Sequence, residues 1–214
     1  MPQPLTDVAI AQAHTLEPIT EIALRAGIPP EALITFGPHK AKVDITRLPE
    51  RREAGKLVLV TGMSPTPAGE GKSTVLIGLA DAMTRRGLNA AAALREPSQG
   101  PVMGIKGGAA GGGYSQIVPM EDINLHFTGD FHAIAAATNT LAAIVDNHVQ
   151  HGNALGIDVR RIVWQRCLDV NDRSLRGVIT GLGGTPRGPP RAAGSTIPAA
   201  SESMAGPSLP AGLE

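Results

Sequence analysis

One stretch constrains the fold more than any other: an apolar run, a glycine loop and an amphipathic helix follow one another between residues 57 and 87. The run Leu57–Thr61 is rich in β-branched residues and is closed by Gly62, which is typical of a strand buried on both faces of a parallel sheet. A helix is predicted over 73–86, where apolar residues recur on one face before Gly87. Strand, loop and helix in this order favour an α/β fold.

The loop between this strand and helix carries the end of the G-x-x-x-x-G-K-[ST] pattern, with Thr66 where the first glycine would stand. Its members are Thr66, Pro67, Ala68, Gly69, Glu70, Gly71, Lys72, Ser73 and Thr74. The two glycines allow backbone N–H groups to turn toward an anion, and Lys72 supplies a cation to the β and γ phosphates. The hydroxyl of Ser73 or Thr74 is offered to Mg²⁺, with Ser73 as the candidate metal ligand. The alternative is an ordinary glycine turn capped by Ser73.

The other segments continue the alternation of helices and strands. Helical spacing of apolar residues is found over 5–27, where Pro18 divides two short helices, and again over 130–151. Strands are predicted at 88–94, 161–165 and 177–180, connecting structure at 29–52 and a long loop at 95–119. We therefore predict a P-loop NTPase-like parallel sheet flanked by helices.

Charge and cysteine content narrow the classes of partner. Lysines plus arginines and aspartates plus glutamates both number 19, so the net charge is zero and neither nucleic acid nor an anionic membrane is expected to bind. Cys167 is the single cysteine and residues 1–20 do not resemble a secretory leader, which favours a cytoplasmic protein. No apolar stretch approaches the ~20 residues that span a bilayer.

The last residues differ in composition from the rest. Residues 181–214 contain 7 glycines and 6 prolines, which predicts a tail without regular structure. Prolines there are expected to prevent a helix. The predicted organisation is a helical segment at 1–55, a nucleotide-binding α/β domain at 56–184 and the tail at 185–214.

Four strings of sequence, taken together, resemble the formate–tetrahydrofolate ligases, also called formyltetrahydrofolate synthetases. These strings are Pro65–Thr74, Leu94–Ser98, Gly104–Tyr114 and Pro119–Asp130. The likeness begins near Asp7, runs through Trp164 to Gly184 and then extends, degraded, to Glu214, but the family's chains are more than twice this long. The resemblance thus implies the N-terminal portion of such an enzyme.

The resemblance implies ATP-dependent activation of formate to formyl phosphate, which tetrahydrofolate then attacks to give 10-formyltetrahydrofolate, ADP and phosphate. It implies ATP and Mg²⁺ as cofactors, with a monovalent cation as a further candidate, and a homo-oligomer for the full-length family. By the family's pattern Lys72 neutralises the transferred phosphoryl group and Arg95 contacts formate or formyl phosphate. His126 and His132 are expected near the same site.

The residues alone leave other interpretations open. In the alternative interpretation Arg95 is a surface cation, and His126 and His132 are partly buried histidines without a catalytic role. The pair Glu121–Asp122 either holds a metal or caps a turn. The competing functions are a stand-alone P-loop ATPase or kinase and a non-catalytic nucleotide-binding module. For the ligase, the truncated chain is expected to be inactive alone.

Overall fold

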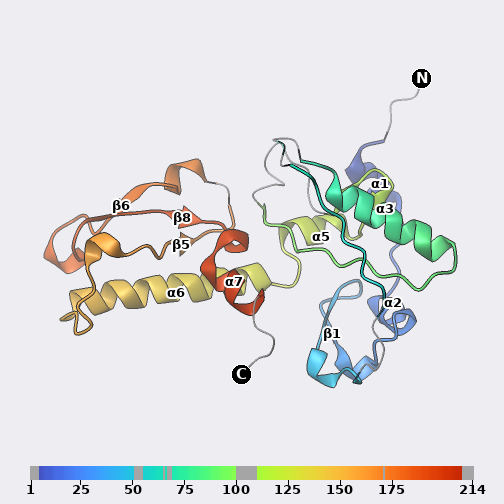
Figure 1. Ribbon diagram of the computed structural model, residues 1–214, viewed down its shortest axis with the longest axis horizontal. Helices are drawn as coiled ribbons and strands as arrows, with labels where there is room; N and C mark the ends of the chain where they lie inside the picture. Colours follow the sequence, from blue (N-terminus) through green and yellow to red (C-terminus); the bar gives the residue numbers. More distant parts are fainter. Residues whose placement is uncertain are drawn as a thin grey trace. The chain divides into compact units, whose positions relative to one another are not determined.

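The computed structural model describes residues 5–50, 55–64, 66, 69–99, 110–170 and 172–208, in which helices and short strands are mixed (Figure 1). The chain divides into two compact units, which are described separately. Unit 1 comprises residues 1–97 and 104–128, and unit 2 comprises residues 98–103 and 129–214.

Unit 1 opens with two short helices, α1 (Asp7–Ala13) and α2 (Ile19–Arg25). The side chain of Thr6 accepts a hydrogen bond from the N–H of Ala9 at 3.2 Å and so caps α1. Pro18 is the N-cap residue of α2, where its missing N–H and fixed φ are tolerated. The predicted helical opening and its division at Pro18 are confirmed.

The next segment, predicted as connecting structure, contains a small antiparallel hairpin. Its strands β1 (Leu33–Thr35) and β2 (Ala41–Val43) pair in a register that places Leu33 opposite Val43. A 3-10 turn lies on either side of the hairpin, η1 (Pro30–Ala32) before β1 and η2 (Ile45–Arg47) after β2.

The long helix of unit 1, α3 (Lys72–Arg85), packs on a second hairpin formed by β3 (Gly111–Gly112) and β4 (Ser115–Gln116). A Cβ atom at Gly78 of α3 would lie 3.0 Å from the hydroxyl of Ser115, and one at Gly111 would lie 2.7 Å from Cδ1 of Ile77. Because neither Gly78 of α3 nor Gly111 of β3 carries a Cβ atom, the helix and the hairpin can approach each other closely. A short helix, α5 (Met120–Leu125), follows the hairpin. The helix predicted at 73–86 is thus confirmed.

The strands predicted at 57–61 and 88–94 are wrong: these residues lie in irregular chain without strand pairing. Leu57 and Leu59, which would share one face of a strand, are 95% and 82% exposed, and Val58 on the opposite face is 51% exposed, so neither face of this segment is covered. A strand of a parallel sheet is stable only when neighbouring strands satisfy its backbone and helices cover its faces. Within the described residues, parallel pairing occurs only in unit 2.

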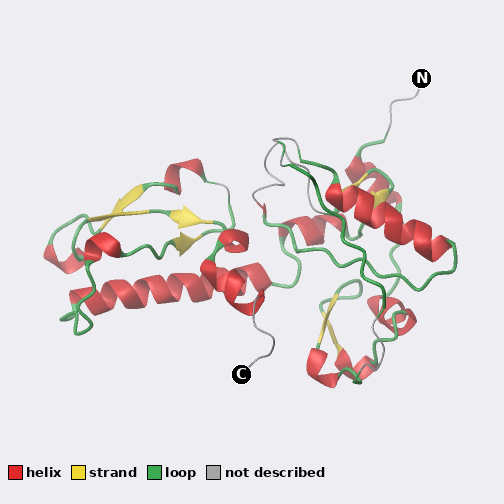
Figure 2. Cartoon of the chain, viewed as in Figure 1, coloured by secondary structure: helices red, strands yellow, loops and turns green. Residues whose placement is uncertain are grey.

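Unit 2 is built around the helix α6 (Asp130–Gln150), above which its short strands run in Figure 2. Strands β5 (Arg166–Cys167) and β8 (Ser195–Thr196) pair in parallel, whereas β6 (Val178–Thr180) and β7 (Arg191–Ala193) pair antiparallel. The helix predicted at 130–151 and the strand predicted at 177–180 are confirmed.

The strand predicted at 161–165 is wrong, because the 3-10 turn η3 (Val159–Arg161) occupies its start and β5 begins only at Arg166. Side chains of α6 hold this part of the chain. The amide of Asn139 donates to the carbonyl of Cys167 at 3.0 Å and accepts from its N–H at 2.7 Å. The indole of Trp164 donates to the carbonyl of Thr138 at 3.1 Å. Hydrogen bonds to α6 thus fix Trp164, which the sequence pattern assigns to a strand, and Cys167, which follows that predicted strand.

The prediction that residues 185–214 lack regular structure is wrong for residues 185–208. They form four further turns or short elements before the C-terminal helix α7: η5 (Thr185–Arg187), β7, β8 and η6 (Pro198–Ala200). The glycines and prolines serve ordered turns, because Gly184 and Gly188, with φ of 88° and 82°, flank η5. Residues 209–214 lie outside the described part of the chain.

The helix that proline was predicted to prevent is present as α7 (Glu202–Ser208). In a helix of seven residues a proline near the end removes only one backbone donor, so its cost is smaller than in a long helix. A hydrogen bond of 2.7 Å from the hydroxyl of Thr138 to that of Ser203 joins α6 to α7. Contact with α6 therefore stabilises a segment that local propensity disfavours.

Candidate functional site

The loop before α3 presents backbone donors at the start of a helix. Gly69 and Gly71 have φ of 88° and 70°, a left-handed conformation that side chains other than glycine rarely adopt. Gly71 is the N-cap residue of α3, and within the described residues no side chain caps this end of the helix. The N–H groups of the first turn are thus open to an external acceptor, and the helix dipole favours an anion there.

Thr66 closes the other side of the loop. Its hydroxyl donates to the carbonyl of Gly69 at 2.9 Å, and the N–H of Gly69 donates to the carbonyl of Thr66 at 3.1 Å. Among the described non-glycine residues only Asn153 has a positive φ, so the backbone at Thr66 does not require the glycine of the usual pattern. Pro67 and Ala68, also predicted to bind phosphate, lie outside the described residues.

The cation of the loop is paired with a carboxylate from the same loop. The ammonium of Lys72 contacts the carboxylate Oε2 of Glu70, while Oε1 accepts from the N–H of Thr66 at 2.8 Å. The hydrogen bond from Lys72, with the one from Thr66, lowers the pKa of Glu70 to about 2. Glu70 is therefore ionised at neutral pH, and its charge faces Lys72.

The predicted Mg²⁺ ligand lies in the first turn of α3. Ser73 is half-buried and Thr74 is exposed, next to Lys72 at the uncapped helix end. A hydroxyl beside a phosphate site suits a cation that is bound chiefly by phosphate oxygens and water. In the part of the chain that the structure describes, no group of three or more His, Cys, Asp or Glu side chains is arranged to hold a metal.

The other predicted site residues are distributed over both units. Arg95 and His126 are exposed in unit 1, and His126 is the C-cap residue of α5. Arg95 makes no hydrogen bond or ion pair with another described residue. His132 belongs to unit 2, where it is exposed in the first turn of α6. The structure thus brings together the loop residues 66 and 69–74, and it leaves Arg95 facing solvent.

Acidic residues near His126 are engaged by partners that sequence reasoning did not identify. The ammonium of Lys40 lies 2.9 Å from Oδ2 of Asp122 and donates to the carbonyl of Phe127 at 2.9 Å. The side chain of Gln12 donates to Glu121 at 3.0 Å. These contacts favour a structural role for the acidic pair, because Lys40 fixes both ends of the turn around His126. Nothing in the sequence marked Lys40 for this role.

Unit 1 also contains a cavity of about 460 Å³, within the size range of small-molecule pockets. Its walls come from α2, α3, α5 and the segment 88–94, and include Ile19, Ile77, Ala90, Ile123 and Phe127. Among the described residues, none that is predicted to act in the ligase reaction lines this cavity.

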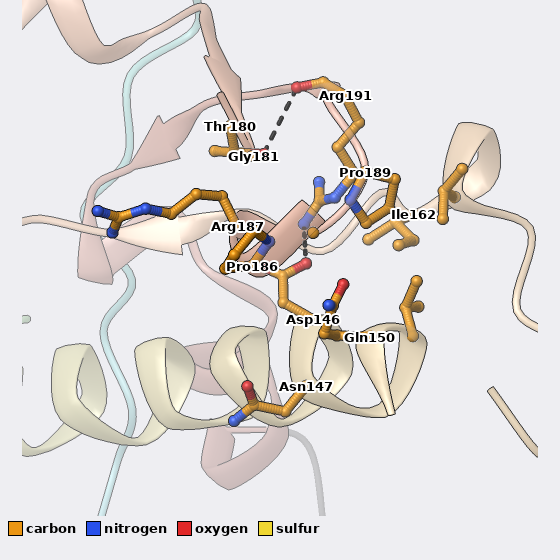
Figure 3. Close-up of a pocket in the computed structure, with 13 residues that line it drawn as sticks. Asp146, Asn147, Gln150, Ile162, Thr180, Gly181, Pro186, Arg187, Pro189 and Arg191 are labelled. Atoms are coloured by element: carbon orange, nitrogen blue, oxygen red, sulfur yellow. Dashed lines mark hydrogen bonds and ion pairs between the residues drawn. The ribbon is translucent and has the colours of Figure 1, made fainter. Parts of the chain in front are cut away.

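A smaller cavity of about 100 Å³ in unit 2 is bordered by an ion-pair cluster (Figure 3). The carboxylate of Asp146 accepts from Arg191 at 2.7 Å and from Arg166 at 2.9 Å, while the side chain of Arg187 points away from it. Burial raises the pKa of Asp146, but the hydrogen bonds from Arg191 and Arg166 outweigh burial and place this pKa below the ordinary value. The cluster ties β5 and β7 to α6.

Comparison with known proteins identifies the family of the chain. The family model for formate–tetrahydrofolate ligase matches residues 5–213. The formate–tetrahydrofolate ligases of Corynebacterium diphtheriae and Corynebacterium jeikeium are each 74% identical to the chain, over 94% and 95% of it. That of Staphylococcus carnosus is 60% identical over 98% of the chain. The chain belongs to the formate–tetrahydrofolate ligase family.

The chain spans only part of the length of these relatives. The matches cover 36%, 37% and 38% of the Corynebacterium diphtheriae, Corynebacterium jeikeium and Staphylococcus carnosus proteins. None of the helices in the described ranges is both long enough and apolar enough to cross a membrane.

Proposed function

We propose that the chain carries the ATP-phosphate site of a formate–tetrahydrofolate ligase. In this reaction the carboxylate of formate attacks the γ phosphorus of ATP, which gives formyl phosphate and ADP. The N10 amine of tetrahydrofolate then attacks the formyl carbon and releases phosphate, leaving 10-formyltetrahydrofolate. The observation that carries the proposal is the uncapped N-terminus of α3 with the ammonium of Lys72 beside it.

The loop would act by positioning and charge neutralisation. The N–H groups at the start of α3 would donate to phosphate oxygens, and Lys72 would turn from Glu70 to the β and γ phosphates. The hydroxyl of Ser73 would hold Mg²⁺ beside them. Bound Mg²⁺ would neutralise charge on the transferred phosphoryl group. Little covalent chemistry is asked of the protein, because formate itself is the nucleophile.

Three further side chains are assigned roles in the proposal. Arg95 would bind formate or formyl phosphate, since its exposed guanidinium matches a planar anion with two parallel hydrogen bonds. His126 and His132 would lie near the same group in the complete active site. The contact of Lys40 with the carbonyl of Phe127 supports a fixed position for the turn that carries His126.

The P-loop NTPase-like parallel sheet is also part of the proposal. It is supported by the order of a glycine loop and a helix, because Gly69 and Gly71 lead directly into α3.

Replacement of Lys72 by alanine tests the nucleotide site. We expect Mg-ATP to bind the folded chain saturably and the Lys72→Ala variant to bind at least tenfold more weakly, because a charge-assisted phosphate contact of about 1.5 to 3 kcal/mol is lost. Isothermal titration calorimetry measures both affinities. The control is Lys42→Ala, which removes a lysine from β2 of the same unit and should leave the affinity unchanged. Equal binding by the wild-type chain and the Lys72→Ala variant would exclude the site.

A further inference from the structure

The carboxylate of Glu70 occupies the groups that a nucleotide phosphate would use. One oxygen contacts the ammonium of Lys72, and the other accepts the N–H of Thr66 at 2.8 Å. An ammonium and a backbone N–H at the start of a glycine loop are the donors that phosphate-binding loops present to their ligand. Glu70 therefore acts toward the loop as an anion supplied by the chain itself.

The two partners of this ion pair differ in freedom. The side chain of Glu70 is 15% exposed and packs on Gly62, where a Cβ atom would lie 3.1 Å from its Cγ. The side chain of Lys72 is 47% exposed, and four rotatable torsions separate its ammonium from the helix. The carboxylate is thus held in place, whereas the ammonium can leave it for another acceptor.

The backbone of the loop is closed in the same arrangement. The hydroxyl of Thr66 holds the carbonyl of Gly69, and the carboxylate of Glu70 holds the N–H of Thr66. The carboxylate is an internal anion that compensates for the positive charge of Lys72 and accepts the N–H of Thr66. Without a bound ligand, these groups would otherwise lack an anionic partner. To bind, a triphosphate would have to displace the carboxylate of Glu70 from the ammonium of Lys72. The negative charge of Glu70 would then repel the phosphates at short range.

We propose that Glu70 is an internal competitor of the nucleotide, which occupies Lys72 in the empty loop and thereby sets the affinity for the triphosphate. This inference rests on the proposed function, because it assigns a regulating residue to the same phosphate site. Removal of the negative charge should tighten nucleotide binding. Because Lys72 is half exposed, the expected gain in affinity is about two- to fivefold.

A double-mutant cycle tests the proposal. The Glu70→Gln variant keeps an oxygen for the N–H of Thr66 but removes the charge that holds Lys72. Calorimetric titrations with Mg-ATP, and separately with inorganic triphosphate, would compare wild type, Glu70→Gln, Lys72→Ala and the double variant. Asp81→Asn is the control, since it removes one exposed negative charge from α3, the helix that begins at Lys72. Circular dichroism of each variant verifies that it is folded.

We expect Glu70→Gln to bind both probes two- to fivefold more tightly, the control to bind as wild type, and the gain to fall below twofold when Lys72 is absent. Unchanged or weaker binding by Glu70→Gln, with Lys72→Ala still weakened, would overturn the role of Glu70 and leave the nucleotide site intact. An equal gain with and without Lys72 would also overturn it. Unchanged binding by Lys72→Ala would remove the nucleotide site itself.

Discussion

The 214-residue chain should form 10-formyltetrahydrofolate at least a few hundredfold more slowly than a complete ligase, even with ATP bound. A folate ring system generally requires an aromatic or apolar platform, and the chain has five aromatic residues. They are Phe36, Tyr114, Phe127, Phe131 and Trp164. Phe131 is buried and Trp164 is hydrogen bonded to α6, so two of the five are used in the packing of unit 2.

A chain that lacks a folate platform does not hold the acceptor amine of tetrahydrofolate at attack distance from formyl phosphate. Positioning of two reactants contributes about 7 to 11 kcal/mol to such reactions. Loss of only half of this term slows turnover by roughly a few hundredfold or more. A coupled assay with saturating ATP, formate and tetrahydrofolate, run beside the Corynebacterium diphtheriae relative, measures the difference. Turnover within tenfold of the relative would place a working folate site inside these residues.

Replacement of Asp146 by alanine should lower the free energy of unfolding of unit 2 by about 2 to 4 kcal/mol. The side chain of Arg191 is only 8% exposed, and Asp146 is the partner of its guanidinium among the described residues. Loss of the carboxylate leaves a buried cation without compensation, which is more costly than loss of an exposed pair. Urea denaturation followed by the fluorescence of Trp164, which lies in the same unit, measures the change.

Asp158→Ala is the matched control, because its partner Arg160 is almost fully exposed and the expected loss is about 1 kcal/mol or less. The double variant Asp146→Ala with Arg191→Met should recover part of the stability, since no buried charge then remains. If Asp146→Ala lowers the free energy of unfolding no more than Asp158→Ala does, Asp146 does not stabilise unit 2 by compensating the buried charge of Arg191.

The ion pairs of Asp146 also make the stability of unit 2 depend on pH, and the sign of this dependence follows from the direction of the pKa shift. The pKa of Asp146 is lower in the folded chain than the ordinary aspartate value, so its stabilising contribution is present above about pH 4. That contribution is lost as the pH falls through the folded pKa. Stability of the Asp146→Asn variant should therefore change less than that of the wild type over this acid range.

Helices α1, α2, α3 and α6 were predictable because their signals are local. Pro18, the spacing of apolar residues along α3 and α6, and Gly87 after α3 act through residues within one or two turns. Boundaries accordingly agree within one residue for α3 and α6. The strand at 178–180 was also found, although its partner β7 lies in a segment that was expected to have no regular structure.

Strands and the last segment were harder to predict because they depend on distant partners. Leu57–Thr61 has the composition of a buried strand, but composition does not supply the neighbours that would cover Leu57 and Leu59. The glycines and prolines after Gly184 fit a disordered tail and tight turns equally well. The ion pair of Arg191 with Asp146 and the hydrogen bond that Thr138 donates to Ser203 contribute order that no local pattern reveals.

The composition of the phosphate loop was predictable, whereas its internal contacts were not. The positive φ of Gly69 and Gly71 agrees with the role that the pattern assigns to glycine. The pairing of Glu70 with Lys72 depends on how the loop folds back on Thr66. A sequence pattern records which residues are present, and these contacts require their arrangement in space.

The most direct test of the central claim is a backbone amide titration by nuclear magnetic resonance with Mg-ATP. If residues 69–74 bind the nucleotide phosphates, the amide signals of Gly69, Gly71, Lys72, Ser73 and Thr74 should shift saturably. The shifts should be reproduced by inorganic triphosphate, because the N–H groups at the uncapped end of α3 would donate to phosphate oxygens. Saturable shifts confined to other residues, with these five signals unchanged, would contradict the account.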